Sequence, residues 1–338
     1  MAAARAKNKK LKVVGGKAPK LSKAKLIKIY EHMLFLRRFQ EKVGSLYQQG
    51  LMGGFCHLYD GQEAVITGAY EASQKGDEFM TTYRCHAHAV TCGVSEEDIL
   101  MELMGRSGGI SKGKGGSMHM FDPEKHFWGG HGIVTGNVPL GAGLAFAAKY
   151  RGESGVTLTF FGDGAANGGQ MYESFNMAQL WKLPVLYIIE NNQYSMGTAL
   201  ERHAVGDLYK RGEPFDIPGK RVDGMDFFAV YEAMAEALAY VRAGNGPMLL
   251  EMDTYRYKGH SLSDPGTYRT RDEVNEIKEQ RDPLVTMVKT LQEKHGVTDA
   301  QLKTMNKKAK ERVAKAEEIA RAAPVADESE LYTDILAE

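Results

Sequence analysis

The sequence predicts an α/β fold in which a doubly wound, mostly parallel sheet is flanked by helices. Two apolar, β-rich runs, Val156 to Phe161 and Val185 to Ile189, bracket a segment from Gln170 to Trp181 with apolar residues at helical spacing. This order of strand, helix and strand places two parallel strands side by side. Ligands of such sheets bind beyond the carboxyl ends of the strands, so we expect a binding site there.

The composition is that of an ordinary globular chain. The 338 residues are 43% hydrophobic, which suits one large domain or two small ones. The net charge of zero gives no reason to expect a nucleic-acid partner. Cys56, Cys85 and Cys92 are odd in number and lack CxxC spacing, so we expect a reducing compartment. No apolar run approaches the roughly 20 residues that span a bilayer, and the start lacks the apolar segment of a signal peptide, so we expect no membrane partner.

Two charged tails enclose a single predicted domain over residues 21–322. Residues 1–20 are basic and small, which predicts a flexible tail, with a docking arm for an acidic partner as the alternative. An organellar transit peptide is a further alternative, but this tail is rich in Lys and not in Arg and Ser. Residues 323–338 form an acidic tail, which we expect on the surface or at an interface. Residues 284–322 are predicted to be helical and to extend the domain at its C-terminal side.

The N-terminal side of the domain begins with a long amphipathic helix. Ser22 is the expected N-cap, and the helix ends near Gly50. Its apolar face is broad enough to suggest burial against another subunit as well as against its own core. A second helix is expected from Gln62, and Phe79 to Arg84 has the composition of a strand that ends in polar groups.

Three histidines lie near these elements. His57 falls on the loop between the first two helices, where a lone histidine is more often structural than catalytic. His86 and His88 alternate after the strand, which could be part of a zinc site. Because no further ligands follow at a zinc-like spacing, we expect both to line the core or the cleft.

The segment from Gly105 to Met120 is rich in glycine and lysine. It has the composition of a flexible surface linker and equally that of a mobile loop near an anionic cofactor. Pro139 to Tyr150 then predicts a helix of small residues, which lets neighbouring elements approach closely. Later in the chain, Phe227 to Arg242 predicts a helix and Met248 to Asp253 a strand. The polar loop from Tyr255 to Gly266 follows that strand, where loops are often functional.

The polar groups after the first two strands have a specific chemistry. Asp163 offers a carboxylate and Asn192 an amide oxygen, which are ligands that Mg²⁺ accepts. Gly162 and Gly164 permit positive φ and let backbone amides approach a ligand, and the helix that follows directs its positive end to the same point. These features together predict Mg²⁺ bound to a diphosphate. A dinucleotide loop is the nearest rival, but Asn167 stands where its third glycine is required.

The spacing of this motif resembles that of thiamine diphosphate enzymes, with GDG at 162–164 followed by 26 residues and then NN at 191–192. From residue 25 to 322 the chain resembles alpha subunits of thiamine diphosphate-dependent 2-oxo acid dehydrogenases, the pyruvate dehydrogenase component above all. This resemblance implies the thiamine diphosphate-binding fold, in its diphosphate-side module. The matching segments are GFCHLYDGQEA (54–64), TYR (82–84), GKGGSMHM (113–120), GIVTGNVPLGAG (132–143), GDGAANGGQ (162–170), NMAQLWKLP (176–184), ENNQYSMGT (190–198) and TYRYKGHSLSDPG (254–266).

The resemblance implies a role for each matching residue. Asp163, Asn192 and the backbone carbonyl of Tyr194 would hold Mg²⁺ on the diphosphate. His57 would lie beside the 2-oxo acid and act with His260 as a catalytic residue, since the charge of a histidine changes near neutral pH. The residues implied to contact thiamine diphosphate are Tyr83, Arg84, Gly132, Val134, Asp163, Gly164, Ala165, Asn192, Arg256 and His260.

The implied reaction is the oxidative decarboxylation of pyruvate, followed by transfer of the acetyl unit to the lipoyl group of dihydrolipoamide acetyltransferase and hence to acetyl-CoA. Family members need a glutamate on a second module, which a beta subunit supplies, so an α₂β₂ heterotetramer is implied. Acetoin or branched-chain 2-oxo acid dehydrogenases are the alternatives, and the DGQEA segment with His57 favours pyruvate over branched-chain acids. A non-catalytic scaffold is a further alternative, against which the intact Asp163, Asn192 and His260 argue.

The polar loop resembles one that is phosphorylated in animal mitochondrial enzymes, with Ser261 at the principal, regulatory position. Ala199 stands where those enzymes have a second serine. This difference, the lysine-rich start and the longer FDPEKHFWGG stretch (121–130) indicate a bacterial protein. We therefore expect a cytoplasmic location, or the mitochondrial matrix if the source is eukaryotic.

Overall fold

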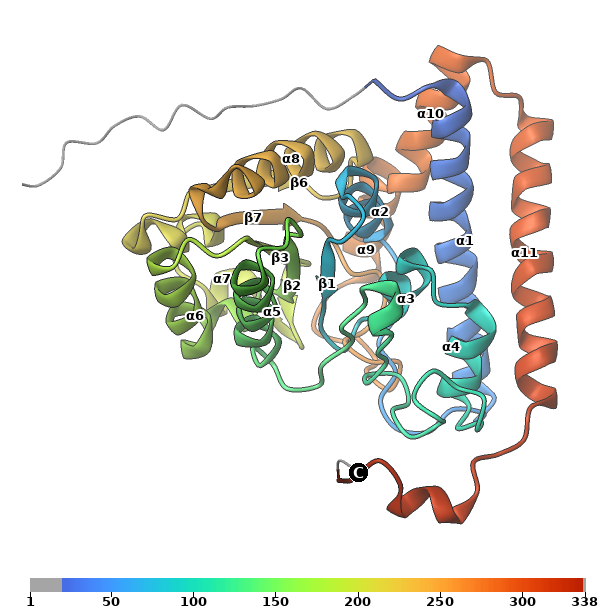
Figure 1. Cartoon of the computed structure of the whole chain (residues 1–338). Helices are drawn as coiled ribbons and strands as arrows, with labels where there is room; N and C mark the ends of the chain where they lie inside the picture. Colours follow the sequence, from blue (N-terminus) through green and yellow to red (C-terminus); the bar gives the residue numbers. More distant parts are fainter. Residues whose placement is uncertain (1–19, 337–338) are drawn as a thin grey trace, which may run out of the picture.

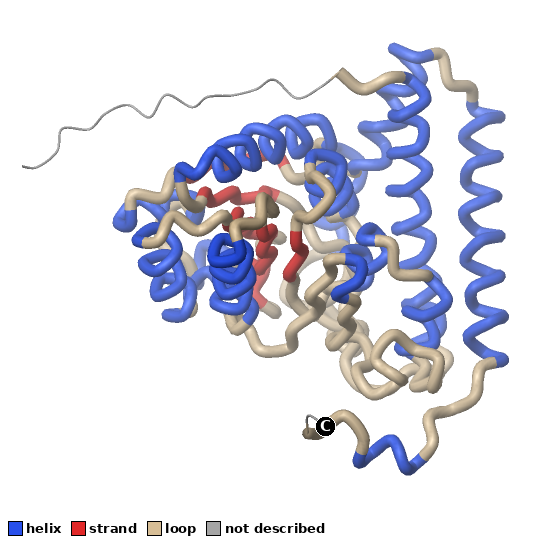
Figure 2. The backbone as a smooth tube through the Cα atoms, viewed as in Figure 1, coloured by secondary structure: helices blue, strands red, loops and turns tan. Residues whose placement is uncertain are grey.

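The computed structural model describes residues 20–336, so nearly all of the predicted basic tail lies outside the described residues. A five-stranded, fully parallel sheet forms the centre of the fold, and helices surround it (Figures 1 and 2). The strand order is β1-β2-β3-β7-β6. The strands are β1 (Glu78–Met80), β2 (Thr157–Gly162), β3 (Val185–Asn191), β6 (Gly219–Asp223) and β7 (Met248–Asp253), and β4 (Tyr194–Ser195) pairs with β5 (Thr198–Ala199) in a separate hairpin.

Alternate residues of each strand supply two hydrophobic cores, because successive side chains point to opposite faces. On one face, Phe161 and Tyr187 pack with α5 (Asn137–Arg151) and α6 (Gly169–Leu180). On the other, Phe160 and Ile188 pack with α8 (Phe227–Tyr240) and its neighbour α2 (Glu63–Ala72). Helices therefore cover both faces, and the predicted doubly wound α/β fold is confirmed.

Small residues permit close contact between these layers. A Cβ atom on Gly141 of α5 would lie 2.0 Å from Oγ1 of Thr159 in β2. A Cβ atom on Gly68 of α2 would lie 2.6 Å from Cγ1 of Val230 in α8. The run of small residues that predicted close packing for 139–150 thus lies where a helix meets the sheet.

The helical extensions form a separate layer beside the sheet. α1 (Lys23–Gln48) begins at the predicted N-cap Ser22, whose hydroxyl accepts a hydrogen bond from the backbone N–H of Lys25. α10 (Pro283–His295) and α11 (Asp299–Ala322) run alongside α1 (Figure 1). Apolar side chains of α1 are buried against α10, α11 and α2 of the same chain. The broad apolar face of α1 therefore does not need a second subunit to cover it.

Two segments differ from the sequence prediction. The strand expected at Phe79 to Arg84 ends at Met80, because the chain then leaves the sheet and Thr81 donates its N–H to the carbonyl of Gly129. β6 was not predicted, since Lys220, Arg221 and Asp223 make this edge strand polar and exposed, as edge strands often are.

The remaining helical elements are α3 (His86–Cys92), α4 (Glu96–Leu103), α7 (Leu200–His203), α9 (Arg271–Arg281), η1 (Pro123–Lys125), η2 (Ala165–Asn167), η3 (Leu208–Phe215), η4 (Val241–Asn245) and η5 (Glu328–Tyr332).

The glycine-rich segment is wrapped around one buried carboxylate. The side chain of Glu102 in α4 accepts hydrogen bonds of 2.7–2.9 Å from four backbone N–H groups, those of Ser111, Gly113, Gly115 and Gly116. The segment is therefore an ordered loop with its own internal anchor and not a surface linker. Lys112 and Lys114 on the same loop form ion pairs with Glu330 and Asp334 near the C-terminal end.

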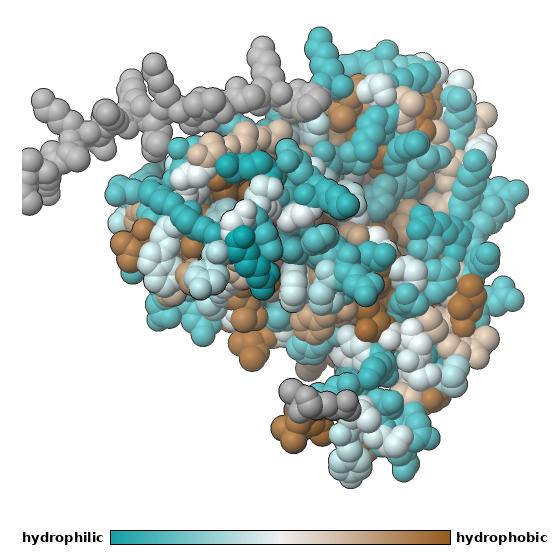
Figure 3. Space-filling model, in the orientation of Figure 1, coloured by the Kyte–Doolittle hydropathy of each residue, from teal (hydrophilic) through white to brown (hydrophobic). Residues whose placement is uncertain are grey.

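Hydrophilic side chains cover most of the face drawn in Figure 3, with apolar patches between them. Within residues 20–336, no helix combines the length and the apolar character that a membrane span requires.

Candidate active site

A pocket of about 250 Å³ lies at the carboxyl ends of β2 and β3. The two strands are paired so that Gly162 lies opposite Glu190, which brings Asp163 and Asn192 to the same edge of the sheet. All the residues implied to contact metal, cofactor or substrate line this pocket, whereas the regulatory candidate Ser261 is buried beside it. The predicted residues that line it are His57, Tyr83, Arg84, Gly132, Val134, Asp163, Gly164, Ala165, Asn192, Tyr194, Arg256 and His260.

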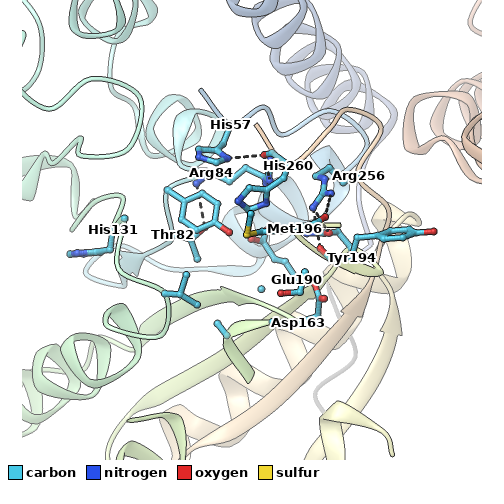
Figure 4. Close-up of a pocket in the computed structure, with 18 of the residues that line it drawn as sticks. His57, Thr82, Arg84, His131, Asp163, Glu190, Tyr194, Met196, Arg256 and His260 are labelled. Carbon is cyan, nitrogen blue, oxygen red and sulfur yellow. Dashed lines mark hydrogen bonds between the residues drawn. The ribbon is translucent and has the colours of Figure 1, made fainter. Parts of the chain in front are cut away.

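Two of the three oxygens expected to bind the metal share one hydrogen-bond donor. The guanidinium Nη1 of Arg256 donates to Oδ1 of Asn192 at 3.2 Å and to the backbone oxygen of Tyr194 at 3.0 Å. Its Nη2 donates to the backbone oxygen of Met196 at 2.8 Å. A single positive group therefore contacts two of the three predicted metal ligands, which indicates that the oxygens are arranged to receive a cation. Arg256 was expected to contact the diphosphate, but in this structure it binds the turn that carries these oxygens (Figure 4).

The donor set fits a hard divalent ion that is bound with a phosphate. It contains one carboxylate, that of Asp163, together with an amide oxygen and a backbone oxygen. Mg²⁺ prefers such oxygens and usually takes only one or two carboxylates when a phosphate completes its shell. A zinc-like cluster is a different arrangement, and residues 20–336 contain no group of three or more His, Cys, Asp and Glu side chains that could hold a metal.

The structure gives a reason for only one of the two glycines of the motif, and that reason differs from the predicted one. Neither Gly162 nor Gly164 has a positive φ. A Cβ atom on Gly164 would lie 2.2 Å from Oγ of Ser195, so this position requires glycine because the 193–196 turn packs directly over it. Gly162 has open space around it. The expectation of a positive φ was therefore wrong, and close packing explains Gly164.

Two buried positive charges face the pocket without a carboxylate partner. Arg84 is 4% exposed and Arg256 is 1% exposed. No Asp or Glu oxygen in the described residues lies within 4.0 Å of either guanidinium, and Arg84 donates instead to the backbone oxygens of Leu58 and His260. Burial, together with the nearby Arg256, lowers the pKa of Arg84 to about 10. Because an unpaired buried charge is costly, this pair indicates that the pocket receives an anion.

The two candidate catalytic histidines lie close together, with ring centres 4.9 Å apart. Burial and the charge of Arg84 lower the pKa of His57 to about 3 and that of His260 to about 4. Both pKa values therefore lie below the physiological range in this structure. Figure 4 shows His57, Arg84 and His260 gathered on the side of the pocket opposite Asp163.

The HxH histidines belong to the core, as expected. His86 contacts the hydroxyl of Ser117 through Nε2 at 2.9 Å, and Ser117 also accepts from the backbone N–H of His57. His88 packs edge-on against Tyr59 and Phe160. The glycine-rich loop thus supports the pocket by placing Ser117 beneath His57, and its Met118 lines the pocket.

Sequence reasoning assigned no role to Glu190, which also lines the pocket and accepts a hydrogen bond from Tyr59. Burial raises the pKa of this carboxyl to about 7. Its position at the end of β3, two residues before Asn192, is the signal that could have identified it. Other lining residues without a predicted role include Gln62, His131, Ser195 and Met196.

The "Dehydrogenase E1 component" family model matches residues 31–329 of this chain. The chain belongs to this family. Members of the dehydrogenase E1 component family depend on thiamine diphosphate, an anionic cofactor, which agrees with the two buried arginines at the pocket. Family membership also agrees with the α/β fold and establishes the chain as part of an oxidoreductase.

Relatives within the dehydrogenase E1 family match nearly the whole chain. The pyruvate dehydrogenase E1 component subunit alpha of Rhizobium meliloti is 53% identical over 332 residues, which cover 98% of this chain and 95% of the relative. The protein of the same name from Rickettsia felis is 53% identical over 94% of this chain and 97% of its own length. The mitochondrial form from Dictyostelium discoideum is 49% identical over 93% of this chain and 83% of its own length.

Proposed function

We propose that this chain is the alpha subunit of a pyruvate dehydrogenase E1 component. In this role it takes part in the thiamine diphosphate-dependent oxidative decarboxylation of pyruvate and in acetylation of the lipoyl group of dihydrolipoamide acetyltransferase. The observation that carries the proposal is that the Asn192 and Tyr194 oxygens share one donor in the pocket that Asp163 lines, where the described residues give Arg84 and Arg256 no carboxylate partner.

The substrate proposal rests on the relatives. The three described above are all named for pyruvate, which favours pyruvate over acetoin and branched-chain 2-oxo acids. We expect the enzyme in the cytoplasm of a bacterium, or in the mitochondrial matrix of a eukaryote.

Each part of the cofactor has candidate partners in the pocket. Asp163, Asn192 and the carbonyl of Tyr194 would hold Mg²⁺, and the backbone around Gly164 together with Arg84 would receive the diphosphate. Thiamine diphosphate, when bound, supplies a carbon nucleophile and an electron sink that allow carbon dioxide to leave a 2-oxo acid.

The protein's own contribution at the substrate end centres on His57. Its Nδ1 is held by the backbone oxygen of His260 at 2.7 Å, which leaves Nε2 as the atom able to accept or return a proton. Tyr83 packs against the ring at 4.5 Å between centres and excludes water from that side. The buried, positively charged surroundings favour an anionic substrate carboxylate and a developing oxyanion.

The pocket is incomplete in this chain, which supports a shared active site. Ile133 is 78% exposed and Val134 is 57% exposed, although both belong to the loop that lines the pocket. Exposed apolar residues at the rim of a binding site are typical of a surface that a partner covers. We propose that a beta subunit covers this rim in an α₂β₂ heterotetramer and supplies the glutamate that thiamine enzymes require.

An Asp163→Ala variant tests the proposal. The parent and the variant are each reconstituted with the beta subunit and titrated with thiamine diphosphate and Mg²⁺ by calorimetry, and turnover is measured on pyruvate, acetoin and a branched-chain 2-oxo acid. We expect the parent to prefer pyruvate and the variant to lose both coenzyme affinity and turnover. Asp272→Ala, which changes an exposed aspartate, is the control. Equal coenzyme affinity in Asp163→Ala and the parent would contradict the proposal.

A further inference from the structure

One contact at the predicted metal site comes from outside the pocket lining. Nε2 of His203, in the short helix α7, lies 3.1 Å from Oδ2 of Asp163. This is the only side-chain hydrogen bond that Asp163 makes within residues 20–336. Asp163 itself is 1% exposed and lines the pocket.

A chain of hydrogen bonds determines which nitrogen of His203 carries the proton. Nη1 of Arg211, which can only donate, lies 2.9 Å from Oδ1 of Asn167. This contact fixes the orientation of the Asn167 amide, whose Nδ2 then donates to Nδ1 of His203 at 3.1 Å. Since Nδ1 accepts a hydrogen bond, the ring proton is on Nε2, which donates to Asp163.

The chain is anchored outside the pocket. Arg211 lies in η3 and also donates to the backbone oxygen of Ala166, so it holds the backbone of η2 as well as the amide of Asn167. The side chain of His203 is 13% exposed. Its polar contacts to Asp163 and Asn167 join α7 to the loop that follows β2.

We infer that His203 is a positioning residue that orients Asp163 for the divalent ion, held in turn by Asn167 and Arg211. The inference rests on the proposed metal site. With Oδ2 bound by His203, the carboxylate is prevented from rotating, and Oδ1 is the oxygen that presents to the ion. Partners that hold a metal ligand in this way typically change metal affinity by about 10–100-fold when they are removed.

The test measures metal binding rather than activity alone. The full chain is reconstituted with its beta subunit, saturated with thiamine diphosphate and titrated with Mn²⁺, whose free form is followed by electron paramagnetic resonance. We expect His203→Ala to bind Mn²⁺ about 10-fold more weakly than the parent. We expect His203→Gln to bind within about threefold of the parent, because its amide nitrogen can replace Nε2 as a donor to Asp163.

Turnover provides the second readout. Because His203 is proposed to act through the ion, we expect the turnover of His203→Ala to approach that of the parent when Mg²⁺ is saturating. At low Mg²⁺ we expect the turnover of this variant to fall below that of the parent. Arg202→Ala is the matched control on the same helix, since Arg202 is exposed and the structure records no side-chain hydrogen bond for it. We expect Arg202→Ala to bind Mn²⁺ as the parent does.

Two results would overturn the inference, and both are distinct from a failure of the proposed function. If His203→Ala binds Mn²⁺ within twofold of the parent, His203 does not position the ligand. If His203→Gln is as impaired as His203→Ala, hydrogen-bond donation is not its role. If the parent itself binds no Mn²⁺ in the presence of thiamine diphosphate, the proposed metal site fails.

Discussion

The Nδ1 atom of His57 lies 2.7 Å from the backbone oxygen of His260. A carbonyl oxygen can only accept, so Nδ1 carries the ring proton and Nε2 has a free lone pair. Since His57 lies on the loop after α1 and His260 on the loop after β7, one hydrogen bond joins two segments that are 203 residues apart. The contact orients the ring of His57 in the pocket and fixes its tautomer.

The first prediction concerns His57. We expect His57→Gln to lower kcat by about 10²–10⁴-fold, the usual contribution of a positioned acid–base group, because an amide cannot transfer a proton at neutral pH. The affinity for thiamine diphosphate should change little, since His57 is expected at the substrate and not at the diphosphate. Steady-state kinetics and coenzyme titration of the reconstituted complex check this. His295→Gln, remote from the pocket, serves as the control, and parental kcat in His57→Gln would exclude proton transfer by this residue.

The second prediction concerns Ser261, which is buried beside His260. Its Oγ lies 2.6 Å from Oγ of Ser263, and Ser263 is exposed. We expect Ser261→Glu to disable the enzyme and weaken coenzyme binding, because it places a negative charge next to the expected diphosphate site. Ser263→Glu adds the same charge two residues away, on the exposed side, and should be tolerated better. Turnover and thiamine diphosphate affinity of both variants are measured, and an active Ser261→Glu with parental affinity would refute the prediction.

The third prediction concerns the anchor of the glycine-rich loop. Glu102→Gln replaces one acceptor oxygen by an amide nitrogen, which cannot accept the two N–H groups that now point to that oxygen. Unsatisfied buried donors cost about 1–3 kcal/mol each, so we expect the loss of two acceptor contacts to lower the free energy of unfolding by about 2–6 kcal/mol. Denaturant unfolding measures it, with Glu97→Gln on the same helix as the control. A fall below about 0.5 kcal/mol, the size of a typical surface change, would mean that the loop is held by other contacts.

The fourth prediction concerns the pH dependence of stability. Burial lowers the pKa of His88 to about 3 from its ordinary value of 6.5. Between these values the unfolded chain binds a proton that the folded chain does not, so His88 destabilises the fold as the pH falls below about 6.5. Each such group contributes up to about 1.4 kcal/mol per pH unit.

Replacement of the ring isolates this contribution. We expect His88→Met, which keeps an apolar contact with Tyr59 and Phe160, to lose less stability than the parent between pH 6.5 and pH 4.5. The comparison is needed because Asp60, whose pKa burial raises to about 7, acts in the opposite direction in both proteins. Thermal unfolding at the two pH values measures the difference. Parallel losses in parent and variant would show that His88 does not titrate as described.

Local sequence predicted much of the site because its parts lie close in the chain. Asp163 and Asn192 each follow a strand, and a right-handed crossover through one helix places the ends of those strands side by side. The resemblance to the family added His57, Tyr83, Arg84 and His260, which line the same pocket although they come from distant segments. Their roles in the reaction remain predictions that the variants above address.

Other features depended on contacts between segments that no local pattern records. Arg256 binds Asn192 and the Tyr194 carbonyl because the loops after β7 and β3 meet, and a pattern of residues after one strand cannot specify that contact. The sequence also did not predict that Glu102 anchors the glycine-rich loop, since a glutamate in a helix is usually exposed. The broad face of α1 suggested another subunit, and only the return of α10 and α11 to the same place explains its burial.

By itself, the sequence determined the parallel α/β sheet, the place of the pocket and the oxygen-bearing side chains at two strand ends. These follow from hydrophobic periodicity and from the geometry of a crossover, which act over a few tens of residues. Only the tertiary structure decided that His203 contacts Asp163 and that burial lowers the pKa values of His57 and His260. Hydrogen-bond partners and burial depend on which distant segments meet, and the packing of the whole chain sets that.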